Sequence, residues 1–203
     1  MHTLTPHRMT RLQRTLPACP PAGAVVVACR PVLATPTDQR VIRDVMAAAF
    51  AGSQVLLIDS VRAAAIGSAT AAGVLLIADV GAELTEVALL VDGRIVGARR
   101  AAVGTHDPTS RGGPRPLAGV VTRLVADIVQ NPRKRRLAAA ALARGAVIVG
   151  DGATIPELTI RLAANLRAHV RPAYTPRLAA LRGAGQAARA AAGHAAVSAR
   201  SRS

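Results

Sequence analysis

Two short glycine-containing turns hold the residues best suited to chemistry in this chain. Asp79 and Gly81 follow the apolar run 75–77, and Gly150 and Gly152 follow a second apolar run that starts near Gly145. Backbone N–H groups in a glycine turn bind anions, and a carboxylate oxygen suits a hard cation. The two turns therefore indicate a site for an anion that is accompanied by a metal ion.

The segment around the first turn predicts a β-meander. Residues 75–77 and 87–91 are apolar runs typical of buried strands. Asp92 and Gly93 form a strong two-residue hairpin signal, and Ile95 and Val96 resume the strand beyond it. The meander therefore carries Asp79 at its first turn.

The preceding segment predicts a βαβ unit. Residues 25–29 and 55–58 are strand candidates, and Thr37 or Asp38 is expected to cap a helix that runs through Phe50. The apolar face of that helix is predicted to be Val41, Val45, Ala48 and Ala49. A second helix is expected at 60–70. Because strands and helices alternate at this spacing, the two strands are predicted to be parallel.

The C-terminal part alternates helices with one more strand. A helix is expected at 117–129, a basic run at 133–136, a strand within 145–152 and a helix at 155–166. The basic run suits phosphate or acidic lipid, or is simply the solvated start of a helix. Beyond Glu157 the chain contains no acidic residue.

Composition sets limits on the class of protein. Half of the 203 residues are apolar, mostly Ala and Val, with one Phe, one Tyr and no Trp. The formal net charge is +15, and Lys134 is the one lysine among 26 basic residues. This charge favours an anionic partner or reflects the base composition of the gene. Cys19 and Cys29 are expected to be reduced thiols, and no charge-free run is long enough for a bilayer span.

The order of these motifs resembles the MreB/Mbl family of bacterial actin homologues (rod shape-determining proteins). Three stretches between Val25 and Arg189 carry the likeness in the family's order: 25–67, 75–104 and 145–189. The resemblance implies an α/β fold made of the two ribonuclease H-like core halves of an actin-like ATPase. The first phosphate hairpin and the insert subdomains have no counterpart, so a truncated, divergent member is expected.

The resemblance also implies roles for particular residues. ATP and Mg²⁺ are the expected cofactors, with Asp79 reaching the metal through water and the nucleotide contacted at the positions Gly81, Thr85, Gly150 and Gly152. Asp59 falls on the family's water-orienting acid and is the candidate catalytic residue.

The chain departs from the family's glycine pattern at both turns. Ala82 and Glu83 replace glycines in the first turn, and Asp151 replaces one in the second. A Cβ blocks close approach to a phosphate, and an added carboxylate repels it. We therefore expect weak or lost ATP binding, or no cofactor at all.

Four segments are expected along the chain. Residues 1–22 are a basic disordered N-terminus, or a short amphipathic helix on an anionic membrane. Residues 23–72 are the remnant of the first core half. Residues 73–189 are the second half, with a Gly/Pro linker at 105–116 that contains His106 and Asp107 as solvated residues. Residues 190–203 are expected to be a disordered Ala/Arg tail.

The sequence thus predicts a noncatalytic cytoskeletal accessory in the cytoplasm. It would assemble with itself or with a full-length MreB-type filament, in association with an anionic membrane surface or without it. Two alternatives stay open. One is a residual ATPase that uses Asp59 and Asp79, and the other is a basic protein that binds anionic lipid or, less favoured, nucleic acid.

Overall fold

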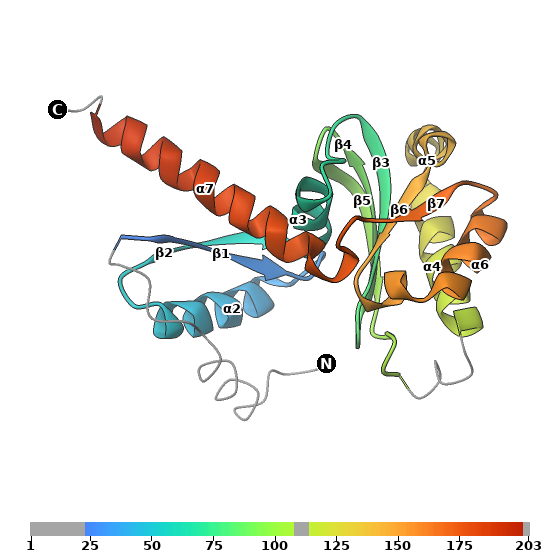
Figure 1. The fold of residues 1–203 in the computed structure, drawn as a ribbon, viewed down its shortest axis with the longest axis horizontal. Helices are drawn as coiled ribbons and strands as arrows, with labels where there is room; N and C mark the ends of the chain where they lie inside the picture. Colours follow the sequence, from blue (N-terminus) through green and yellow to red (C-terminus); the bar gives the residue numbers. More distant parts are fainter. Residues whose placement is uncertain (1–22, 108–113, 201–203) are drawn as a thin grey trace.

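The chain folds around two β-sheets of different size. The computed structural model describes residues 23–107 and 114–200 (Figure 1). A two-stranded sheet contains β1 and β2, and a five-stranded sheet has the order β5-β4-β3-β6-β7. The strands are β1 (Val25–Arg30), β2 (Gln54–Asp59), β3 (Val74–Val80), β4 (Thr85–Val91), β5 (Arg94–Ala101), β6 (Ala146–Val149) and β7 (Val170–Pro172). The helices are α2 (Pro36–Ala49), α3 (Ser60–Gly67), α4 (Pro114–Val129), α5 (Pro132–Arg144), α6 (Pro156–Leu166) and α7 (Ala179–Arg200), with short 3₁₀ turns η2 (Asp151–Thr154) and η3 (Pro176–Leu178).

The five-stranded sheet is covered on both faces. Strands β3, β4 and β5 form the antiparallel meander that the sequence predicts, and β6 and β7 extend it in parallel. Alternate side chains of β3 point to opposite faces, as strand geometry requires. Leu76 packs in the core formed with α4, α5 and α6, whereas Ile77 packs in the core formed with α3. The result is a three-layer unit with two apolar cores.

The hairpin between β4 and β5 has the predicted turn. Asp92 and Gly93 both have positive φ, at 47° and 73°. This matches a type I′ turn, whose twist suits two antiparallel strands. The Asp92 carboxylate also accepts a hydrogen bond from the Gly73 N–H at 2.8 Å, which ties the turn to the start of β3.

The two-stranded sheet is parallel, with α7 on one face and α2 on the other (Figure 1). Its strands pair from Val25 with Gln54 to Arg30 with Asp59. Of these strand residues only Ala28 is buried, and α2 has no buried residue. This small unit is therefore much less tightly packed than the five-stranded one.

Helix α2 begins earlier than expected. Thr35, and not Thr37 or Asp38, is the N-cap: its hydroxyl accepts from the Asp38 N–H at 3.1 Å, and the Asp38 carboxylate accepts from the Thr35 N–H at 2.9 Å. This reciprocal pair is a capping box with Pro36 in the first turn. The expected apolar face is also partly wrong, because Val41 and Ala48 are exposed.

Helices α3 and α7 cross at two glycines, and this crossing joins the two units. A Cβ on Gly67 would lie 2.0 Å from the Ala179 carbonyl oxygen, and one on Gly183 would lie 1.8 Å from the Ala63 carbonyl oxygen. Backbones this close tolerate no side chain at either position. Because α7 also packs on β1, it spans both units.

Three other expectations need correction. Helix α3 ends at Gly67 instead of residue 70, and α4 begins at Pro114, inside the expected linker. Residues 190–200, expected to be a disordered tail, are the second half of α7. The expectations for residues 1–22 lie outside the described residues. None of the helices in the described ranges is long and apolar enough to cross a bilayer.

Candidate functional site

The structure brings Asp79 and Gly150 together at the ends of neighbouring strands. Strands β3 and β6 are parallel and pair Asp79 with Val149, so the two turns lie at the same end of the sheet. Gly150 has φ +81°, and a Cβ there would lie 2.5 Å from the Asp79 Oδ1 and 2.6 Å from the Val80 carbonyl oxygen. Only glycine fits this position, since the backbone conformation and the contact both exclude a side chain.

Gly152 is held against the same strand. Its missing Cβ would lie 2.5 Å from the Val80 Cγ1, and the residue is buried in η2. The sequence therefore identified three residues, Asp79, Gly150 and Gly152, that share one end of the large sheet.

The β3–β4 turn is closed by internal hydrogen bonds. The Gly81 N–H donates to the Leu84 carbonyl at 2.9 Å, and the Gly81 carbonyl accepts from the Thr105 N–H at 2.9 Å. The Ala82 carbonyl accepts from the His106 N–H at 2.8 Å. The segment after β5 thus supports the turn from one side.

Thr85 has a structural partner. Its side chain is fully buried, and its hydroxyl donates to the Val103 carbonyl at 2.7 Å. The hydroxyl proton is committed to that carbonyl, which anchors the segment after β5 to the start of β4.

Two of the turn amides already have protein acceptors. Besides the Gly81 N–H, the Gly150 N–H donates to the Pro176 carbonyl at 3.0 Å. A phosphate oxygen that bound either of these two amides would have to displace a carbonyl, so the new bond would replace one of similar strength.

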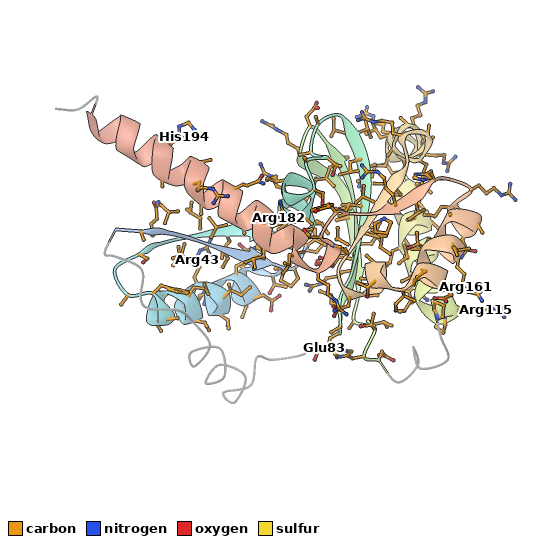
Figure 2. The ribbon with its side chains drawn as sticks, viewed as in Figure 1. Arg43, Glu83, Arg115, Arg161, Arg182 and His194 are labelled. Carbon is orange, nitrogen blue, oxygen red and sulfur yellow. The ribbon has the colours of Figure 1, made fainter. Side chains whose placement is uncertain are left out.

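Acidic groups gather at this end of the sheet. Burial, together with the nearby Asp151 carboxylate, raises the pKa of Asp79 to about 6. Asp151 forms an ion pair with Arg177, with 2.8 Å between Oδ1 and Nε. Figure 2 shows Glu83 at the tip of the β3–β4 turn, where its side chain is exposed. Negative charge here disfavours a triphosphate.

A cation would find few direct ligands. Within the described ranges, no group of three or more His, Cys, Asp or Glu residues could hold a metal ion. Asp79 offers one carboxylate, so Mg²⁺ bound through water at this residue stays a prediction.

Asp59 lies on the other sheet. It ends β2, where it pairs in register with Arg30, and its Oδ1 lies 3.2 Å from the Arg30 Nε. Its side chain lines a cavity beside β5. The carboxylate is therefore engaged by a guanidinium, and its catalytic role stays a prediction.

Glu86 is an important residue that the sequence reasoning did not single out as a site. It lies on β4 with only 4% of its surface exposed. Its carboxylate accepts from the Val32 N–H and from the Ser60 hydroxyl, the latter at 2.5 Å. Burial raises its pKa to about 7, against the opposing effect of these donors. The sequence signal that could have identified it is an acidic residue directly beside the apolar run 87–91.

Glu86 links the two units of the fold. Val32 follows β1 and Ser60 begins α3, whereas Glu86 belongs to the five-stranded sheet. The position of the small sheet thus depends on a buried carboxylate as well as on the α3–α7 crossing.

Comparison with solved structures defines the class of protein. MreB5 of Spiroplasma citri bound to AMPPNP is similar with a TM-score of 0.69 and 16% identity, over 80% of this chain and 67% of that one. The ADP-bound form of the same protein gives 0.68 and 16% over 87% and 70%. A MamK double helical filament gives 0.61 and 14% over 90% and 74%. The chain therefore has the actin-like fold, and the predicted fold class is confirmed.

The family follows from the sequence. Residues 9–109 match the family model described as MreB/Mbl protein, and this part of the chain belongs to the MreB/Mbl family. No curated protein sequence matches the chain. The predicted resemblance is confirmed.

Proposed function

We propose that this protein is a noncatalytic cell-shape accessory of bacterial actin filaments, with weak or lost ATP binding. It would act in the cytoplasm and assemble with itself or with a full-length MreB-type filament. The actin-like fold and the family match support a cytoskeletal role. The name of one similar structure, a MamK double helical filament, supports self-assembly.

The observation that carries the proposal is the internal pairing of the two turn amides. The Gly81 and Gly150 N–H groups donate to protein carbonyls at 2.9 and 3.0 Å. Glu83 and Asp151 add acidic side chains beside the same turns. A triphosphate would meet occupied donors and repulsion together, which supports weak or absent binding.

Calorimetric titration with magnesium ATP tests the loss of binding. At a protein concentration of about 100 µM, we expect no measurable heat for the native chain. A dissociation constant of about 1 mM or weaker would leave too little complex to detect. The double variant Glu83→Gly with Asp151→Gly should gain affinity, because it removes both acids. Asp44→Ala, which removes an exposed acid of α2, is the matched control. Micromolar affinity of the native chain would contradict the proposal.

Sedimentation tests assembly. We expect the chain to pellet with a full-length MreB-type filament, and to pellet without added nucleotide when it assembles alone. A chain that stays in the supernatant under both conditions, while melting cooperatively, would contradict the accessory role.

A residual ATPase is the second candidate. Two similar structures are described as bound to AMPPNP and to ADP, and this chain retains Asp79 and Gly150 in contact. Phosphate release that disappears in both Asp79→Ala and Asp59→Ala would favour this candidate. Release that continues in both variants would point to a contaminant.

Binding to an anionic membrane is a third candidate, based on the basic run at 133–136. Arg133, Arg135 and Arg136 are exposed in the first turns of α5. Nucleic acid fits this run less well, because base stacking needs aromatic side chains and the whole chain has one Phe and one Tyr. Cosedimentation with anionic vesicles, with and without the four residues neutralised, decides this question.

A further inference from the structure

A cavity of about 420 Å³ lies beside β5, which is an edge strand of the five-stranded sheet among the described residues. It is bounded by the segment that follows β1, by Asp59 at the end of β2, by β5 and by Lys134 of α5. Asp59, the candidate catalytic residue, lines it, but Asp79, Gly81, Gly150 and Gly152 do not. It is thus a separate feature of the molecule, distinct from the Asp79 region.

The floor of the cavity is a strand edge. Residues 95–99 of β5 line it consecutively, and β5 stands at the end of the strand order, paired with β4. The other edge of such a strand presents main-chain N–H and C=O groups that a further strand can pair with. An extended peptide laid along β5 would therefore extend the sheet by β-augmentation.

The charges around the cavity are mainly positive. Arg30, Arg99 and Lys134 line it together with one acid, Asp59, which is paired with Arg30. The Arg99 side chain is exposed. Its guanidinium donates hydrogen bonds to the Ala98 carbonyl at 2.9 Å and to the Asp127 carbonyl at 3.4 Å, which fix its position. Because Asp59 is the one acid in the lining and is paired with Arg30, the positive charges of Arg99 and Lys134 are not offset by a lining carboxylate.

The start of α5 adds to this field. Lys134 lies in the first turn, whose N–H groups are capped by the Asn131 side chain at 3.0 and 3.4 Å, and that turn contains no acidic residue. A helix N-terminus carries partial positive charge, which basic side chains reinforce here. Apolar Val32, Leu33 and Val96 complete the lining, and Leu33 is 56% exposed.

We propose that the β5 edge and this cavity form a docking site for an extended acidic segment of another protein. Strand pairing with β5 would supply the main-chain bonds, Arg99 and Lys134 would bind carboxylates, and the apolar lining would take alternate side chains. A second copy of this chain suits this particular site poorly, because its sequence has 11 acidic residues against 26 basic ones. The proposal does not depend on filament assembly or on nucleotide binding.

Fluorescence anisotropy with a labelled peptide of alternating Glu and Val, about eight residues long, tests the site. We expect saturable binding that weakens steeply with added salt. The double variant Arg99→Glu with Lys134→Glu should weaken binding roughly tenfold or more.

Arg161→Glu, which reverses one charge where the double variant reverses two, is the control for net charge. This exposed arginine lies on α6, which packs against β7 at the opposite edge of the sheet, and Figure 2 shows it far from the small unit. Its reversal should change the affinity less than about twofold. Equal losses in the control and in the double variant would overturn the site, since attraction would then follow net charge alone.

A second peptide isolates strand pairing from charge. N-methylation at alternate residues removes main-chain donors and keeps every carboxylate, so we expect it to abolish most of the binding. Equal affinity of the methylated peptide, or full competition by millimolar inorganic phosphate, would overturn the strand-edge mode in favour of a simple anion site. Thermal melts of each variant confirm that the fold is intact.

Discussion

The central strands of the large sheet and the two strands of the small sheet are all apolar, but they differ greatly in packing. Strands β3, β4 and β6 are almost entirely buried, whereas β1 and β2, also rich in Val, Leu and Ile, are half-buried along most of their length. The five-stranded sheet has helices on both faces and neighbours for its central strands. The small sheet has two strands, and α2 covers it without burying any of its own residues. Apolar sequence is therefore not enough for a core: the number of layers and neighbours decides burial.

The largest difference between the two sheets should appear on truncating matched leucines. Leu76 of β3 is 2% exposed, so Leu76→Ala should lower the free energy of unfolding by about 3 kcal/mol or more. Leu57 of β2 is half-buried, and Leu57→Ala should cost about 1 kcal/mol. Urea denaturation measures both. Equal costs would show that the small sheet is as well packed as the large one.

The α3–α7 crossing should be the next most sensitive feature. Gly183→Ala places a methyl group 1.8 Å from the Ala63 carbonyl oxygen, so the helices must separate, at a cost of about 1 to 3 kcal/mol. Gly185→Ala is the matched control on the same helix. Nothing lies within 4 Å of a Cβ there, and the change should stabilise the helix by about 0.5 to 1 kcal/mol. Thermal unfolding measures both variants. Melting temperatures that shifted in the same direction for Gly183→Ala and Gly185→Ala would contradict the close crossing.

Glu86 should make the link between the two units depend on pH. Its pKa in the fold is raised from 4.5 to about 7, so the folded state binds a proton more tightly than the unfolded chain. Its contribution is most favourable below about pH 4.5 and is lost as pH rises through 7. The total change is on the order of 3 kcal/mol at most, since each pKa unit corresponds to about 1.4 kcal/mol.

Glu86→Gln should flatten this part of the profile and raise stability at pH 8 relative to the native chain. Asp79, whose pKa is raised to about 6, titrates in the same range, so Asp79→Asn is the companion variant. Urea denaturation between pH 5 and 8 measures both. An unchanged slope in Glu86→Gln would mean that the carboxylate is ionised without penalty.

Local patterns in the sequence identified most of the fold. The Asp92–Gly93 hairpin and the apolar runs of β3 and β4 depend on neighbouring residues, and the structure has them where expected. The start of α2 was missed because Thr35 precedes Pro36 and its role becomes clear only with Asp38 as its reciprocal partner. The helical part of the Ala/Arg tail was missed because α7 is anchored by its contact with α3 and β1, far away in the sequence.

The candidate site was predictable only in part, because some of its features are local in the sequence and others depend on distant residues. Glycine turns after two apolar runs pointed to Gly150 and Gly152, but the acceptors of the turn amides, such as the Pro176 carbonyl, could not be read from spacing. Glu86 was passed over as a site because its partners, Val32 and Ser60, lie 54 and 26 residues away. The Arg30 partner of Asp59 depends likewise on the register of two strands.

The smallest effect is expected for that ion pair. The Arg30 and Asp59 side chains are 24% and 19% exposed, so water screens their attraction, and Asp59→Asn should cost less than about 1 kcal/mol. Adding Arg30→Gln should restore part of the loss, which a double-mutant cycle in urea measures. Molar salt should shrink the coupling further. A coupling above about 2 kcal/mol would mean that the pair is effectively desolvated, and the small sheet would then be held by charge where the large sheet is held by its apolar core.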